Sequence, residues 1–310
     1  MNTQSNAMSG SSLESQGIAP AVLAATRPLY WSVRREVWEN RSIYVAPLAV
    51  AALFLVGFLI SLIRLPGQMR AASALGPMEQ HTLIAQSYLI ASGLMMVTTL
   101  AVGVFYCLDA LYGERRDRSI LFWKSLPVSD LTTVLSKAIT PVVILPLVTF
   151  AITVLTHWIM LLVSTAVLLG SGLSVEPLWT HAALFQTWLG LLYHLLTVHG
   201  LWYAPLYGWL LLVSAWARRA PFLWAGLPLL AIGVVEKIAF NTSHFGAMLA
   251  DRLIGGGDGG NFMTDSLSMH PLMHFIPAQF LVSPGLWIGL AVAAAFLAAA
   301  VRLRHNQGPI

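Results

Sequence analysis

Three long stretches of the chain, 43–63, 83–108 and 282–301, contain no Asp, Glu, Lys or Arg. A helix needs roughly 20 apolar residues to cross the hydrocarbon core of a bilayer, and a charged side chain near its centre is costly. Only 10% of the residues are charged, against about 25% in a soluble domain. The chain is therefore predicted to be an all-α polytopic membrane protein with one transmembrane domain over 28–304.

Six transmembrane helices are expected, and the basic residues between them predict their orientation. The spans are placed at about 43–63, 83–108, 138–165, 197–217, 220–240 and 282–302. With both termini in the cytoplasm, thirteen Lys and Arg residues lie inside and three outside, and Lys237 lies late in the fifth span. Because short cytoplasmic loops carry an excess of Lys and Arg, this asymmetry favours that orientation.

The stretch between Glu176 and Arg218 and the two ends of the chain need separate interpretations. No charged residue occurs between Glu176 and Arg218, so this stretch could hold two short spans. The charge asymmetry favours one span, preceded by an outer amphipathic or re-entrant segment near 178–195, where Trp and Tyr are frequent. The first sixteen residues lack the basic start and apolar core of a secretory signal. We expect a disordered tail at 1–27 and a short tail at 305–310.

Residues 28–40, just before the first span, have the pattern of an amphipathic helix. Its apolar side chains recur at helical spacing, at Tyr30, Val33 and Val37. Arg35 and Glu36 lie largely opposite them. Such a helix lies in the membrane interface, either as a plain anchor or as an elbow helix that also touches a cytoplasmic partner. The residues expected to serve this elbow are Trp31, Arg34, Arg35 and Trp38.

The loop between the second and third spans, 109–130, is richer than a simple connector needs to be. It places mixed charges beside a cluster of apolar and aromatic side chains. Arg together with aromatic anchors is typical of the centre of a protein interface. The loop is interpreted either as a solvated connector with inside-positive charges or as a docking surface for a soluble protein.

The order of these elements and the sequence of the loop resemble the membrane subunits of bacterial ATP-binding-cassette (ABC) exporters of the second export type. In that family the loop has a Glu-x-x-x-x-Ser/Gly-aliphatic pattern followed by a Leu-Pro-small turn. The matching positions here are Glu114, Ser119, Ile120, Leu121, Leu126 and Pro127. The family usually has Gly-Thr where this chain has Arg118-Ser119. The resemblance covers about 28–304.

The resemblance implies a permease in a bacterial inner membrane. Its partners would be membrane lipid, a second permease copy, either identical or different, and a separate ABC ATPase. The loop would be the coupling element, and its coupling residues would be Glu114, Arg115, Arg116, Asp117, Arg118, Phe122 and Trp123. None of the three lysines follows a glycine, so the phosphate-binding Gly-x-x-x-x-Gly-Lys-Ser/Thr loop is absent. ATP and Mg would bind to the partner, and the chain itself would hold no cofactor, bind no nucleic acid and catalyse no reaction.

Two groups of polar residues inside the expected spans are candidates for a transport pathway. Small and hydroxyl side chains in the second span permit close helix packing, and in the resembling family this span lines the pathway. Ionisable residues within a span indicate function by default, although those late in the fifth span could also anchor it at the outer interface. The candidates are Ser92, Thr98, Thr99, Glu236 and Lys237.

The histidines give the main alternative. His194 and His199 are five residues apart, and His270 and His274 are four apart, a spacing that can hold a metal on a helix. The zincin His-Glu-x-x-His pattern is missing, so interfacial histidines are favoured and no metal site or catalytic residue is assigned. The remaining alternatives are a histidine-dependent metal or haem membrane enzyme, or an accessory membrane protein that transports nothing.

Overall fold

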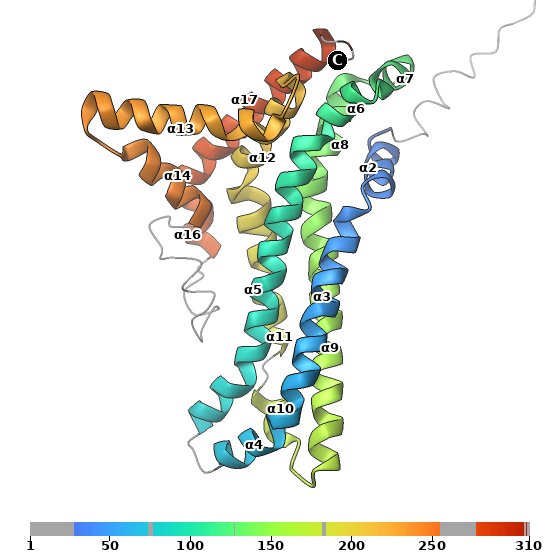
Figure 1. The fold of residues 1–310 in the computed structure, drawn as a ribbon, viewed down its shortest axis with the longest axis vertical. Helices are drawn as coiled ribbons and strands as arrows, with labels where there is room; N and C mark the ends of the chain where they lie inside the picture. Colours follow the sequence, from blue (N-terminus) through green and yellow to red (C-terminus); the bar gives the residue numbers. More distant parts are fainter. Residues whose placement is uncertain are drawn as a thin grey trace, which may run out of the picture.

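The computed structural model describes residues 28–73, 77–126, 128–181, 184–254, 277–306 and 308. Regular structure in these ranges is entirely helical, without strands. The predicted disordered tail at 1–27 lies outside the described residues, as do Pro127, His270 and His274. Figure 1 shows a long upright bundle with one arm extending from its side.

The first half of the chain forms three long helical segments with short helices at their ends. The elements are α2 (Pro28–Glu39), α3 (Ser42–Ser61), η1 (Leu62–Arg64), α4 (Leu65–Ser73), α5 (Pro77–Ala110), α6 (Tyr112–Arg116), α7 (Ser119–Ser125), α8 (Asp130–Ile139), η2 (Thr140–Ile144) and α9 (Leu145–Gly170). The second half contains α10 (Glu176–His181), α11 (Leu184–His194), η3 (Leu195–Trp202), α12 (Ala204–Trp216), α13 (Pro221–Phe240), α14 (His244–Ile254), α16 (Pro277–Val282) and α17 (Pro284–Asn306).

The apolar spans expected from the sequence are present as long helices. Five segments of the described chain are long and apolar enough to cross a membrane: Ser42–Ala71, Ile84–Arg116, Asp130–Gly170, Pro221–Phe240 and Pro284–Asn306. A sixth exists if the helices before and after Tyr203, which meet at an angle of 48°, are counted as one bent span. Helices this long and apolar indicate a membrane protein.

The bundle has two layers that meet along α5. The helices α3, α5 and α9 pack together, and α12 packs between α5 and α17. Close approach of α12 and α17 requires a glycine, because a Cβ atom at Gly208 would lie 3.2 Å from the carbonyl oxygen of Ala293. Tyr207 and Leu211, which are almost fully buried, fill the space between α5 and α12.

Two π-helical segments, η2 and η3, face each other inside the bundle. Pro141 and Pro146 stand in and directly after η2, where each removes a backbone N–H from the helical hydrogen-bond ladder. A Cβ atom at Gly200 of η3 would lie 3.0 Å from the carbonyl oxygen of Val142. The widened turns thus pack backbone against backbone, which agrees with kinks expected at prolines.

The expected amphipathic or re-entrant segment near 178–195 corresponds to α10 and α11, and these helices belong to a bent pair that is either a broken span or a re-entrant loop. Helix α11 packs along α9 and continues through η3 towards α12 (Figure 1). Its Trp188 donates a hydrogen bond from Nε1 to Nδ1 of His157, 3.1 Å away inside the bundle. The polar group of Trp188 therefore finds its partner on another helix and not in water at the interface.

The expected fifth span is present as α13, an apolar helix long enough to cross a membrane. In Figure 1, α13 extends sideways away from the bundle, and α14 returns towards it. Ala225 is the only buried residue of α13. Ala220, just before the helix, has a left-handed backbone with φ of 48°, which turns the chain away from α12. Within the single chain α13 contacts α12 and α5 near its start, and most of its apolar surface is exposed.

Candidate functional site: a buried ionic network

A cluster of buried charges lies at one end of the bundle, here named the charged end, where α2, α6, α8 and the last turn of α17 meet (Figure 1). Its first member is Glu36 on the inner face of α2, with 0% of its side chain exposed. The Glu36 carboxylate accepts hydrogen bonds from Lys137 Nζ at 2.9 Å, from the Tyr106 hydroxyl at 2.8 Å and from Arg35 at 2.8 Å. Three helices therefore converge on one carboxylate.

Glu114 of α6 is the second buried carboxylate, with 8% of its side chain exposed. Lys137 Nζ lies 3.0 Å from Glu114 Oε1, and Arg35 Nη2 lies 3.4 Å from the same oxygen. The other oxygen, Oε2, accepts from Arg304 near the end of α17. Lys137 is thus shared between Glu36 and Glu114 and joins α2 to the loop helix α6.

The last turn of α17 closes the network on its far side. Arg304 Nε donates to Asp130 Oδ1 at 3.0 Å, and His305 Nδ1 lies 3.3 Å from Asp130 Oδ2. Lys124 Nζ on α7 donates to the carbonyl oxygen of His305 at 3.2 Å. The loop between α5 and α8 is therefore held to α17 at three points: Glu114, Lys124 and Asp130.

The charges of the network balance, which explains how they can be buried. The carboxylates are those of Glu36, Glu114 and Asp130, and the cations are Arg35, Lys137 and Arg304. A buried charge is tolerated only when paired and hydrogen-bonded. Burial acts to raise the pKa of Glu36, but Lys137, Arg35 and the hydrogen bond from Tyr106 outweigh it, so this pKa lies below its ordinary value.

Helix α6 is also fastened to the end of α12. The Ser214 hydroxyl accepts hydrogen bonds from the backbone N–H groups of Leu111 at 3.0 Å and Tyr112 at 2.8 Å. These N–H groups lie at the break between α5 and α6. Arg115 donates to the carbonyl oxygens of Ser214 and Ala217. The loop helix is therefore anchored on α12 as well as on the network.

Helix α7 projects beyond the network at the charged end (Figure 1). Ile120 is buried and holds the helix down, whereas Leu121 and Phe122 are 58% and 60% exposed. The Phe122 ring packs edge-on against Trp123 at 4.9 Å, and the Arg35 guanidinium lies over the Trp123 ring at 3.7 Å. An apolar surface thus stands in front of the ionic network and contacts it through Arg35.

The proposed coupling residues divide into two groups. Glu114 and Arg115 are buried and bonded within the chain, so their side chains are not presented at the surface. Trp123 is partly covered. The exposed members are Arg116, Asp117, Arg118 and Phe122. The two groups lie on one continuous element, with the buried group behind the exposed one.

The residues proposed for the elbow helix divide in the same way. Trp31 and Trp38 are exposed, and the Arg34 guanidinium lies 5.2 Å and 4.5 Å from their ring centres. Arg35 instead turns inward, beside the buried Ser32 and Glu36. The polar face of α2 therefore packs against the protein, and its aromatic face points away from it.

The pathway candidates are not brought together. Ser92 and Thr99 are buried between α5 and α9, where Thr99 donates to the Thr149 hydroxyl at 3.0 Å, and Thr98 donates to the carbonyl oxygen of Leu94 on its own helix. Glu236 caps α14, since its carboxylate accepts from the N–H groups of His244 at 2.7 Å and Phe245 at 2.9 Å. Its neighbour Lys237 is exposed on α13.

The buried histidines act as hydrogen-bonding groups of the bundle. His157 must accept at Nδ1 from Trp188, because an indole N–H only donates, so its Nε2–H is free to donate to the Tyr88 carbonyl at 3.2 Å. His199 Nε2 lies 3.0 Å from the Met96 carbonyl oxygen. Among the described residues, no group of three or more His, Cys, Asp or Glu is placed to hold a metal ion.

Several residues of the network were not singled out from the sequence: Glu36, Tyr106, Asp130, Lys137, Ser214 and Arg304. Lys137 and Arg304 counted only as charges near span ends, and Glu36 only as part of the polar face of α2. One signal was available. A polar stripe on a helix that lies in the interface, together with isolated charges of both signs at span ends, indicates ion pairing between helices.

Comparison of the chain with protein-family models, with curated proteins and with solved structures returned no match.

Proposed function

We propose that the chain is the membrane-spanning subunit of an ATP-driven ABC exporter. In this proposal α6 and α7 form the coupling element, and α7 docks on a separate ATPase subunit. Two permease copies work together in a bacterial inner membrane, with both termini in the cytoplasm. The observation that carries the proposal is the buried ionic network, which ties this loop to α2, α8 and α17 at once.

The exposed part of the loop has the chemistry of a protein-docking surface. Leu121 and Phe122 are exposed in the middle of α7, and the paired charges of Arg116 and Asp117, 2.9 Å apart, are exposed just before this helix. Interface centres favour aromatic residues and Arg, surrounded by polar groups. A partner that grips this surface would move α7 as a unit, because Ile120 and the Trp123–Arg35 contact fix it to the chain.

The network then supplies the route by which such a movement reaches the spans. Glu114 cannot shift without breaking or carrying its contacts to Lys137 and Arg304. Breaking a buried pair costs about 3–5 kcal/mol, so movement of the connected helices together is favoured. In the proposal, closure of the ATPases pushes α7, and α6, α8, α2 and α17 respond as one body.

The test is purification of the tagged chain from its native membrane, followed by mass spectrometry of the proteins that accompany it. We expect a near-equimolar ABC ATPase with the wild type and its loss with the L121S/F122S variant. Phe185→Ser on α11 is the matched control, since Phe185 is also an exposed aromatic residue but lies away from the charged end. Recovery of the intact chain without any ATPase, even after crosslinking, would contradict the proposal.

A further inference from the structure

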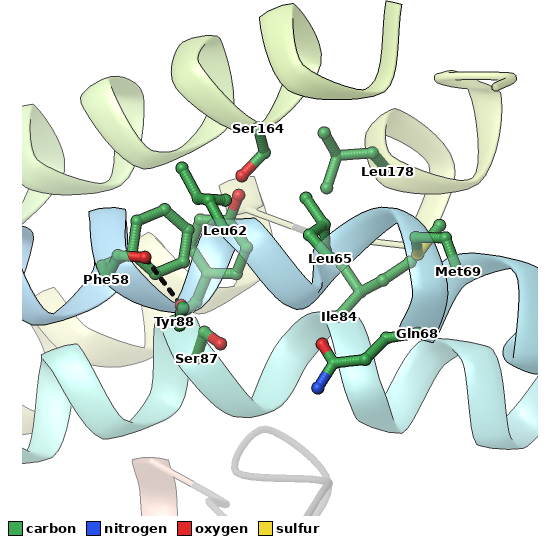
Figure 2. A pocket seen from close by; sticks show the side chains of 11 residues that line it. Phe58, Leu62, Leu65, Gln68, Met69, Ile84, Ser87, Tyr88, Ser164 and Leu178 are labelled. Atoms are coloured by element: carbon green, nitrogen blue, oxygen red, sulfur yellow. Dashed lines mark hydrogen bonds between the residues drawn. The ribbon is translucent and has the colours of Figure 1, made fainter. Parts of the chain in front are cut away.

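A cavity of about 60 Å³ lies at the opposite end of the bundle from the ionic network. Figure 2 shows its lining, which comes from the end of α3, from η1 and α4, from α5, and from α9 and α10. Six hydrocarbon or thioether side chains form most of its wall: Phe58, Leu62, Leu65, Met69, Ile84 and Leu178. A mostly apolar wall with a few polar groups is typical of a small-ligand site.

One polar group of this wall is unsatisfied. Tyr88 is 3% exposed, and its hydroxyl has no hydrogen-bond partner within the described part of the chain. Ser164 of α9, also buried, lines the cavity beside it (Figure 2). The Ser61 hydroxyl is already engaged, since it donates to the Phe58 carbonyl oxygen at 2.7 Å. Leaving a buried hydroxyl unpaired costs about 1–3 kcal/mol, so an occupant that bonds Tyr88 would be stabilised.

The size and wall of the cavity define the occupant. A single water needs about 10–15 Å³ of such volume, so the cavity is several times larger than one water. Its polar lining residues are Ser61, Gln68, Ser87, Tyr88 and Ser164, and the six apolar side chains match hydrocarbon. The same space takes a hydroxyl group and the first few carbons attached to it. The cavity lies at the ends of α3 and α9, both apolar enough to cross a membrane, so a molecule dissolved in lipid can reach it.

We propose that this cavity binds the head of a single-chain membrane amphiphile that carries a hydroxyl group, with the Tyr88 hydroxyl as its hydrogen-bond partner. A phenol both donates and accepts, as does an alcohol, so the pair can form in either direction. The hydrocarbon chain follows the apolar side chains of α3 and α4. This binding belongs to one chain and is independent of ATP, of an ATPase and of transport.

The test is photolabelling of the purified chain by a long-chain primary alcohol that carries a diazirine near its hydroxyl end, with the labelled peptides identified by mass spectrometry. We expect saturable labelling within 58–69 and 84–88, removed by excess unlabelled alcohol. Tyr88→Phe should raise the alcohol concentration that gives half-maximal labelling about fivefold, as expected for the loss of one hydrogen bond of about 1 kcal/mol. The matching alkane diazirine, without a hydroxyl, should label wild type and Tyr88→Phe equally.

The matched control is Tyr207→Phe. The Tyr207 hydroxyl is also buried without a partner in the described chain, but Tyr207 does not line this cavity. It should leave labelling unchanged. Ser164→Leu, which fills the cavity, should abolish saturable labelling while thermal unfolding shows that the chain remains folded. Non-saturable labelling, labelling confined to other segments, or equal half-saturation in wild type and Tyr88→Phe would overturn the proposal.

Discussion

The Lys137 ammonium of α8 lies 2.9 Å from a carboxylate oxygen of Glu36 and 3.0 Å from one of Glu114, although these acids belong to α2 and α6, which α3, α4 and α5 separate in the sequence. One cation therefore serves two buried anions. Separating either acid from Lys137 removes one of the cations that pair it in a buried site, which is costly. This shared contact makes α2 and the loop helix α6 dependent on each other.

Lys137→Met should destabilise the chain by about 3–5 kcal/mol, because it leaves two buried carboxylates without their common cation. Thermal unfolding in detergent measures this. Lys124→Met is the control, since Lys124 is exposed and donates to a backbone carbonyl oxygen, that of His305. A similar loss of stability in both variants would show that Lys137 has no special part in the network.

Stability should fall when acid protonates Glu36. The pKa of Glu36 in the folded chain lies below its ordinary value of 4.5. Its contribution to stability is therefore fully present above pH 4.5 and is lost as the pH falls through the lower, folded-state pKa. Unfolding midpoints measured from neutral to acid pH should show this loss, and Glu36→Gln should be less stable at neutral pH with a shallower acid dependence. An identical pH profile in the two proteins would contradict this role.

Arg118, between α6 and α7, should be replaced by glycine without harm. Its backbone has φ of 58°, the left-handed region that costs an ordinary residue about 1–2 kcal/mol. Glycine removes this strain, partly offset by its greater freedom in the unfolded chain. We expect Arg118→Gly to be at least as stable as the wild type and Arg118→Val to be about 1 kcal/mol less stable, both measured by thermal unfolding. Equal loss in both variants would refute the argument.

The sequence predicts the spans well and the ionic network poorly, for a physical reason. Charge-free stretches of 20 residues have few alternatives to a membrane helix, and α3, α5, α9 and α17 form where expected. The pairing of Glu36 with Lys137 joins residues 101 positions apart, and nothing local to either residue encodes it. Helix α13 also forms where the fifth span is expected, but its apolar sequence does not encode how the helix lies against the others.

Arg304 should determine how firmly the loop is held at the charged end. Its side chain is 3% exposed and bonds both Glu114 of α6 and Asp130 at the start of α8. Arg304→Gln leaves both acids short of a cation, so α6 and α7 should detach more often while the long helices remain. Trypsin cleaves after Arg116, Arg118 and Lys124 when local unfolding lets the backbone of these exposed residues enter its active site, so the cleavage rate reports this opening. We expect about tenfold faster cleavage in this loop, corresponding to about 1.4 kcal/mol of easier opening. The control is Arg302→Gln, two residues away and exposed, which should leave the cleavage rate unchanged. A similar acceleration in both variants would mean that loss of charge from α17, and not the Arg304 contacts, releases the loop.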